Sequence, residues 1–149
     1  MKEISGDLFS LTILNIADAI CITTNGVVKK NGRSVMGAGC ALSAKNKFKD
    51  IDLKLGNLIK ENGHIVQVII WEPKPIVSFP TKVNYWENSR FSLIEDSIEQ
   101  LVLLTDKMKW NKVVLPRPGC SNGGFNWVVQ IKPVIKKKLD DRFFVISKW

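Results

Sequence analysis

The chain has 149 residues, 45% hydrophobic and 24% charged, a length and composition that fit one domain with a single hydrophobic core. It contains no apolar run of about 18 residues and no N-terminal signal-peptide pattern, so we expect a cytoplasmic, monomeric protein without membrane association. The formal net charge of +8 favours polyanionic partners such as nucleic acid, although lysines spread along the chain also suit an ordinary solvated surface.

Six short runs rich in β-branched and apolar residues predict strands. In chain order they span residues 3–5, 19–24, 65–71, 76–79, 113–115 and 143–147. The third and sixth runs are apolar at successive positions, as expected for strands that are covered on both faces. Helical patterns separate the strands, so we predict an α/β fold with a mixed sheet between helices.

Two helices are predicted between the second and third strands. The first begins within or just after residues 36–39 and continues towards Lys49. The second spans residues 52–61 and ends at Asn62-Gly63, a common helix stop signal.

Two more helices are predicted in the second half of the chain. Ser92 with Glu95 three residues later forms a potential capping box at the start of a long amphipathic helix. The last helix covers residues 127–139 and contains Pro133, which either kinks this helix or begins a new one.

A loop with three glycines follows the fifth predicted strand, over residues 116–126, and precedes the last helix. Glycine lets backbone N–H groups approach a ligand closely, and the following helix N-terminus adds partial positive charge. The loop therefore predicts a phosphate site, although the same order also occurs as a plain turn; its spacing is neither that of a P-loop nor Gly-x-Gly-x-x-Gly. A second glycine loop, Gly37-Ala38-Gly39, could clamp a diphosphate from the opposite side.

Cysteine and histidine give little support for thiol or metal chemistry. The three cysteines are widely spaced and odd in number, which suits reduced thiols. Cys120 lies in the glycine loop, but the sole histidine, His64, has no sequence link to it that would suggest a nucleophile with its base. The spacing matches no zinc-ligand pattern, so we expect no metal.

Three polar side chains lie at or beyond strand ends, which line ligand crevices in open α/β sheets. Asp7 can accept a hydrogen bond from a nucleobase amine or cap the next turn. Asn25 can face a sugar hydroxyl or form a turn with Gly26. Lys82 follows the fourth strand and precedes Tyr85-Trp86, where it can act as an amine nucleophile towards a sugar's latent aldehyde or remain a surface lysine.

Several motifs occur in order along the chain: Gly6-Asp7-Leu8-Phe9, Thr24-Asn25-Gly26, Met36-Gly37-Ala38-Gly39-Cys40-Ala41, Phe79-Pro80-Thr81-Lys82 with Trp86 and Ser89, and Leu115 through the glycine loop to Trp127. Together they resemble the macrodomain family, and they look most like its branch of terminal ADP-ribose glycohydrolases and DNA ADP-ribosyl glycohydrolase antitoxins. The resemblance implies one macrodomain over residues 1–149. Its expected architecture is a three-layer α/β/α sandwich with a six-stranded mixed sheet and an ADP-ribose cleft at the strand ends.

The resemblance also implies roles for individual residues. Lys82 matches the catalytic lysine of this branch, which attacks the anomeric carbon of the distal ribose and releases the modified base or carboxylate. Asp7 would bind the adenine amine and Asn25 would face the distal ribose. The other residues expected to bind ADP-ribose are Leu8, Gly37, Ala38, Gly39, Pro116, Gly119, Cys120, Ser121, Asn122, Gly123, Gly124 and Phe125. ADP-ribose is expected as ligand or product, with no other cofactor.

The glycine loop departs from its relatives at three positions. Gly123 stands about where protein-directed glycohydrolases of this branch place an aspartate, which argues against hydrolysis of ADP-ribosyl-glutamate. Ser121 and Asn126 replace a glycine and an aspartate of the DNA-directed relatives. The loop therefore lacks a carboxylate, and Lys82 would work with substrate groups or water.

Three functions fit this resemblance. The leading hypothesis is a glycohydrolase that uses Lys82 to remove ADP-ribose from a nucleic-acid base or a protein, with the basic surface binding a phosphate backbone. In an ADP-ribose 1″-phosphate phosphatase, Lys82 would instead bind the terminal phosphate. A non-catalytic reader would bind ADP-ribose in the same cleft without turnover.

Overall fold

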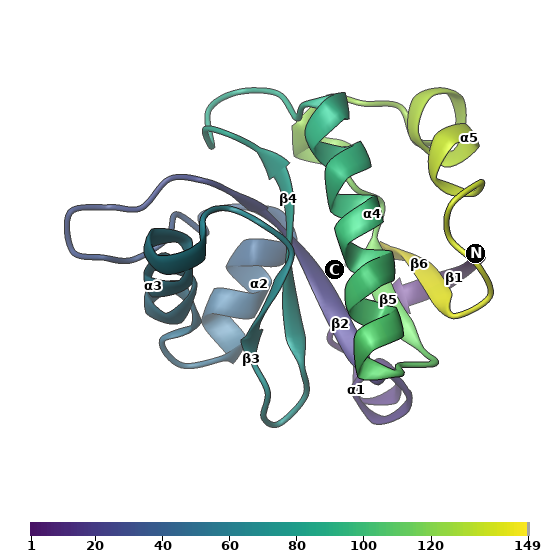
Figure 1. Cartoon of the computed structure of the whole chain (residues 1–149), viewed down its shortest axis with the longest axis horizontal. Helices are drawn as coiled ribbons and strands as arrows, with labels where there is room; N and C mark the ends of the chain where they lie inside the picture. The colour runs from purple at the N-terminus through teal and green to yellow at the C-terminus, as the bar shows by residue number, and fades with distance from the viewer. Residues whose placement is uncertain (149) are drawn as a thin grey trace.

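In the computed structural model, which describes residues 1–148, a six-stranded sheet lies between two layers of helices (Figure 1). The strands are β1 Lys2–Asp7, β2 Ala19–Asn25, β3 Gln67–Ile70, β4 Ile76–Lys82, β5 Val113–Pro116 and β6 Phe143–Lys148. Their order is β1-β6-β5-β2-β4-β3, and every neighbouring pair is parallel except β3 with β4. The predicted α/β fold with a mixed sheet is confirmed.

Alternating side chains of the central strands bury both faces of the sheet. In β2, Ala19 and Cys21 pack into one hydrophobic core, whereas Ile20 and Ile22 pack into the other. The same alternation occurs in β5 and β6. Successive side chains of a strand point to opposite faces, so apolar residues at every position require helices on both sides.

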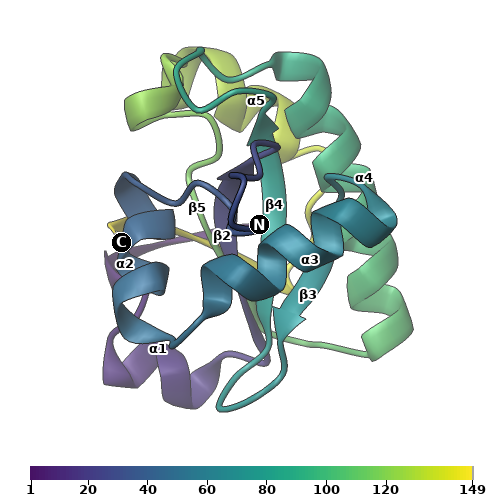
Figure 2. The same cartoon turned by 90° about the vertical axis from the view of Figure 1, so that its left-hand side faces the viewer.

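The helices divide between these two faces, as Figure 2 shows from the side. One face is covered by α1 Leu11–Ile16, α2 Gly39–Lys47 and α3 Ile51–Asn62. The other is covered by α4 Phe91–Met108, a π-helical turn Trp127–Ile131 and α5 Lys132–Ile135. Within the described chain, none of these helices has the length and apolar character needed to cross a membrane.

The predicted capping box at Ser92 is wrong. Helix α4 begins at Phe91, and Arg90 is its N-cap residue without a side-chain cap. The Arg90 N–H donates to the carbonyl oxygen of Thr81 at 2.9 Å, so the end of β4 fixes where the helix starts. Ser92 and Glu95 consequently lie inside the helix.

The last predicted helix is two shorter elements. Asn126 caps the π-helical turn, because its Oδ1 accepts a hydrogen bond from the Val129 N–H at 2.9 Å. Pro133 lies in the first turn of α5, so it begins a new helix, which was one of the two predicted alternatives. This helix ends at Ile135, short of the predicted end at residue 139.

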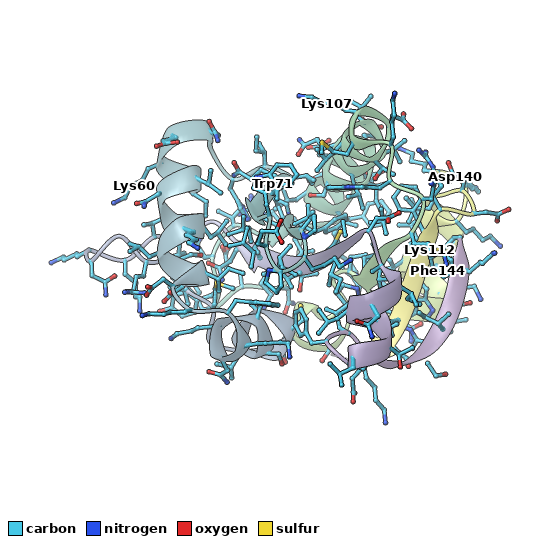
Figure 3. All side chains as sticks on the ribbon, turned by 90° about the horizontal axis from the view of Figure 1, so that it is seen from below. Lys60, Trp71, Lys107, Lys112, Asp140 and Phe144 are labelled. Carbon is cyan, nitrogen blue, oxygen red and sulfur yellow. The ribbon has the colours of Figure 1, made fainter. Side chains whose placement is uncertain are left out.

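Basic side chains are distributed over the surface. Lys60 on α3, Lys107 near the end of α4 and Lys112 before β5 are all exposed and lie on different sides of the molecule (Figure 3). This distribution fits a solvated surface with a positive long-range potential.

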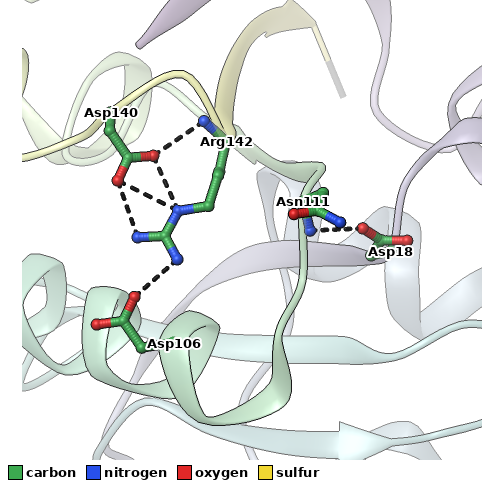
Figure 4. A network of polar contacts seen from close by, with 5 residues as sticks. All are labelled: Asp18, Asp106, Asn111, Asp140 and Arg142. Carbon is green, nitrogen blue, oxygen red and sulfur yellow. Dashed lines mark hydrogen bonds and ion pairs between the residues drawn. The ribbon is translucent and has the colours of Figure 1, made fainter.

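Polar contacts tie together the loops that precede β2, β5 and β6. The Arg142 guanidinium donates to Asp106 of α4 at 2.7 Å and to Asp140 at 2.8 Å (Figure 4). Asp18 accepts hydrogen bonds from the backbone N–H groups of Asn111 and Lys112. These contacts hold the amino ends of the strands and leave their carboxyl ends open for a site.

Candidate functional site

A cavity of about 360 Å³ lies at the carboxyl ends of β2, β4 and β5. Ligands in open α/β sheets bind at this edge, and the volume lies within the range of small-molecule sites. The predicted site residues that line it are Asn25, Gly37, Ala38, Gly39, Lys82, Pro116, Gly119, Cys120, Ser121, Asn122 and Gly123. Segments that are far apart in the sequence thus meet around one space.

Four predicted residues do not line this cavity. Asp7 is exposed at the end of β1 and is separated from β5 by β6, whereas Leu8 is fully buried in the core. Gly124 and Phe125 shape the glycine loop, since Gly124 has a positive φ of 87° and the Phe125 N–H bonds within the loop. Their contacts with ADP-ribose stay predictions.

The N-terminus of α2 forms one wall of the cavity. Its N-cap residue, Ala38, has no side chain that could bond the free N–H groups of the first helical turn. These N–H groups and the positive end of the helix dipole are therefore available to an anion. A Cβ at Gly37 would meet no atom within 4 Å, which leaves open space in front of this helix.

The glycine loop, which includes the 3₁₀ turn Ser121–Gly123, forms the opposite wall. A Cβ at Gly119 would lie 2.5 Å from Ile94 Cδ1, and one at Gly123 would lie 2.3 Å from Ser89 Oγ. The loop can pack this closely only because these positions lack side chains. An aspartate at position 123 would displace Ser89. Glycine at this position, in place of the aspartate, therefore goes with a different local packing around Ser89.

Lys82 joins the end of β4 to the glycine loop. Its Nζ donates to the carbonyl oxygen of Asn122 at 3.1 Å and to that of Tyr85 at 3.5 Å. Among the described residues, the cavity lining includes the cationic residues Lys82 and Arg117 and no carboxylate. The Arg117 guanidinium lies over the Trp127 ring and 3.9 Å from Glu3, so Lys82 supplies the cation; with the N–H groups of α2 it makes the cavity suit an anionic ligand.

Asn25 positions the segment that leads to α2. Its Nδ2 donates to the Val35 carbonyl oxygen at 2.8 Å, and its Oδ1 accepts from the Val27 N–H at 3.0 Å. One amide hydrogen and one lone pair remain for a ligand, so the turn role and the sugar-facing role are compatible.

His64 contacts Thr24, one of the residues that line the cavity, and the sequence did not indicate this role. Its Nε2 lies 2.8 Å from Oγ1 of Thr24, which in turn contacts Ser78 Oγ at 2.8 Å. Thr24 lines the cavity beside Asn25. Burial lowers the pKa of His64 to about 4, so the ring is neutral at pH 7.

Acidification is expected to destabilise the protein through His64. The pKa falls from 6.5 in the unfolded chain to about 4 in the fold, so between these values the unfolded state binds more protons. Stability from this group is full above pH 6.5 and falls by roughly 2 to 3 kcal/mol by about pH 4.5. Urea denaturation of the wild type and of His64→Gln, above pH 6.5 and at about pH 4.5, should show that the free energy of unfolding falls more in the wild type on acidification. Equal losses in the two proteins would contradict this expectation.

The cysteines at the cavity are not activated thiols. Burial raises the pKa of Cys120 to about 11, and burial also raises the pKa of Cys40, whose sulfur contacts the Thr23 backbone N–H at 3.3 Å. Both groups are therefore protonated at neutral pH, which argues against a nucleophilic cysteine. Within the part of the chain that the structure describes, no group of three or more His, Cys, Asp or Glu residues could hold a metal ion.

Sequence reasoning did not place several lining residues in the predicted site: Thr23, Thr24, Val35, Met36, Cys40, Ala41, Thr81, Tyr85, Ser89 and Arg117. Most lie within two positions of predicted residues, so proximity to a strand end or glycine loop was the available signal. Ser89 is the most informative of them, because its hydroxyl is buried without a hydrogen-bond partner among residues 1–148. Buried hydroxyls usually have partners, so this one is available to a ligand.

Solved structures share this fold, although no family model matches the chain. The macrodomain of Mycobacterium tuberculosis DarG has a TM-score of 0.79 and 26% identity, covering 99% of this chain and 97% of that one. The macrodomain of Thermus aquaticus DarG has a TM-score of 0.77 and 25% identity with the same coverage. The chain has the macrodomain fold. Thermosipho africanus DarTG in complex with ADP-ribose shares the macrodomain fold at 19% identity and a TM-score of 0.78, covering 98% of this chain and 41% of that one.

Curated relatives are similar in sequence as well. The DNA ADP-ribosyl glycohydrolase of Thermus aquaticus is 27% identical over 153 residues, which cover 95% of this macrodomain and 37% of the relative. The Mycobacterium tuberculosis protein of the same name is 27% identical over 130 residues, with coverage of 83% and 34%. The macrodomain thus spans about a third of the length of the curated relatives that it matches.

Proposed function

We propose that this macrodomain binds ADP-ribose in the cavity and releases it from a modified nucleic-acid base by means of Lys82. The observation that carries the proposal is the position of the Lys82 amine, which lies at the glycine loop of a cavity whose lining, among residues 1–148, includes no carboxylate. In such a cavity an amine is the available nucleophile, whereas a carboxylate general base is not.

The two walls of the cavity suit the two halves of the bound group. The N-terminus of α2 and the glycine loop can bind the diphosphate with backbone N–H groups. Lys82 contacts the glycine loop at Asn122, so the distal ribose would lie next to the amine. Asn25 and the unpaired hydroxyl of Ser89 are within the same lining and can bind ribose hydroxyls.

The proposed reaction consumes one water molecule. The neutral Lys82 amine forms a bond to the anomeric carbon as the bond to the base breaks; the electron pair leaves with the base, which takes up the proton that the lysine nitrogen releases. Opening of the sugar ring gives a Schiff base between Lys82 and the ribose. Hydrolysis of this Schiff base returns the lysine and free ADP-ribose.

The comparisons favour DNA as the molecule to which the ADP-ribose is attached. Both curated relatives are named DNA ADP-ribosyl glycohydrolase. The net charge of +8 on this chain supports binding to a phosphate backbone by counterion release. We therefore place ADP-ribosylated DNA ahead of ADP-ribosylated protein as the substrate.

The test is the release of ADP-ribose from an ADP-ribosylated DNA oligonucleotide by the wild-type macrodomain, followed by mass spectrometry. Release with return of the unmodified oligonucleotide is the expected result. Release only from ADP-ribosylated protein would contradict the DNA assignment. Phosphate release from ADP-ribose 1″-phosphate alone would indicate a phosphatase, and binding of ADP-ribose in calorimetry without any turnover would indicate a reader.

A further inference from the structure

Two aromatic side chains stand exposed beside the cavity. Tyr85 and Trp86 lie between β4 and α4, where they are 50% and 67% exposed. Their rings meet edge to face, with centroids 4.9 Å apart and planes at 90°. By contrast, Trp110 and Trp127 are less than a tenth exposed in the core. The pair therefore contributes little to the core and leaves ring surface available to a partner.

This aromatic pair is continuous with the proposed reaction site. Tyr85 lines the cavity, and its carbonyl oxygen accepts a hydrogen bond from Lys82 Nζ at 3.5 Å. In the proposed reaction, a group attached to the carbon that Lys82 attacks would lie close to Tyr85, which Trp86 follows in the chain. In the proposed substrate this group is a nucleobase with its neighbouring nucleotides.

The segment that carries the pair is held at both ends. The Gly26 N–H donates to the Val83 carbonyl oxygen at 3.0 Å, which attaches the start of the segment to the end of β2. The Ser89 N–H donates to the Gly123 carbonyl oxygen at 2.9 Å, which attaches its end to the glycine loop. A surface fixed in this way binds a partner without a large loss of conformational entropy.

The charges around the pair indicate which partner it suits. Lys82 and the half-exposed Arg90 flank the aromatic rings in the chain, and the one acidic residue between them, Glu87, lies 3.8 Å from Arg90. Aromatic rings among cations are typical of surfaces that bind single-stranded nucleic acid, where bases stack on rings and cations attract phosphates. In a duplex the faces of the bases are already stacked, so the rings could not reach them without unstacking.

We propose that Tyr85 and Trp86 form a stacking surface for an unpaired nucleobase adjacent to the ADP-ribosylated nucleotide. The inference rests on the proposed function, because it requires the modified nucleotide to occupy the cavity. It predicts that the nucleotide next to the modified one contributes to binding, so that an oligonucleotide is bound more tightly than a modified mononucleoside.

The experiment compares kcat/KM for an ADP-ribosylated single-stranded oligonucleotide and for the ADP-ribosylated mononucleoside with the same modified base. Trp86→Ala should lower kcat/KM on the oligonucleotide by about tenfold, mainly through KM, and change that on the mononucleoside by less than about twofold. Trp86→Phe should retain most of the wild-type value. Trp71→Ala is the matched control, because Trp71 is 53% exposed but follows β3, at the opposite end of β4 from Lys82.

An equal loss on both substrates, or no loss on the oligonucleotide, would overturn the stacking surface. If the wild type releases ADP-ribose from neither substrate, the proposed function fails. The stacking surface is then tested separately, by the binding of an unmodified oligonucleotide. Fluorescence anisotropy with an unmodified single-stranded oligonucleotide should then show about tenfold weaker binding for Trp86→Ala and unchanged binding for Trp71→Ala. Equal affinities of Trp86→Ala and the wild type, or tighter binding of duplex than of single strand, would overturn it.

Discussion

Lys82→Ala is expected to lower the rate of ADP-ribose release by at least about 100-fold, because it removes the nucleophile and no lining carboxylate can replace it. The measurement is release from the ADP-ribosylated oligonucleotide at saturating substrate. The fold should be preserved, since Lys82 is half-buried and, among residues 1–148, its side-chain amine bonds only to the carbonyl oxygens of Tyr85 and Asn122. An unchanged melting temperature would confirm that the loss is chemical.

Lys82→Arg separates a nucleophile from an electrostatic role. Arginine keeps the positive charge but is not deprotonated in proteins, so it cannot form the carbon–nitrogen bond. We expect this variant to be as inactive as Lys82→Ala while it still binds ADP-ribose. A covalent adduct of wild-type protein after reduction with cyanoborohydride, located at Lys82 by mass spectrometry, would support the Schiff base. Activity in Lys82→Arg would contradict it.

Much of the fold could be predicted because local pattern and burial agree. The alternation in β6 follows from a two-residue period, so apolar residues at successive positions already implied helices on both faces. The glycine loops were visible because glycines directly follow strand signals. These features depend on neighbouring residues in the chain, and the sequence displays them directly.

Contacts between distant segments could not be predicted in the same way. Arg90, and not Ser92, is the N-cap residue of α4, because the Arg90 N–H bonds to the end of β4. The preferences of residue types for the N-cap position carry no information about that contact. His64 reaches Thr24 across 40 positions of sequence, so neither residue alone indicates the pair. The resemblance suggested the role of Asp7, but its exposed position two strands away from β5 leaves that role to a binding experiment.

Gly56 is the position where a single methyl group should have the largest effect on stability. It lies within α3, and a Cβ there would be 1.9 Å from the carbonyl oxygen of Gly32 and 3.2 Å from the Ser34 N–H nitrogen. Both neighbours are backbone atoms and cannot rotate away. The Ser34 N–H also donates to the Asp52 carbonyl oxygen at 2.9 Å, so moving this segment away would break its attachment to α3.

Gly56→Ala is therefore expected to destabilise the fold by roughly 2 to 3 kcal/mol, although alanine in an unobstructed helix would stabilise it by up to about 1 kcal/mol. The displaced segment continues into Val35 and the N-terminus of α2, so binding of ADP-ribose should weaken in the molecules that remain folded. Asn57→Ala is the matched control, since Asn57 is the next residue of α3 and is exposed. Urea denaturation and calorimetry should show a large loss for Gly56→Ala and almost none for Asn57→Ala. Equal stability of the two variants would show that the segment around Gly32 yields without cost, and that the cavity wall it supports does not depend on this contact.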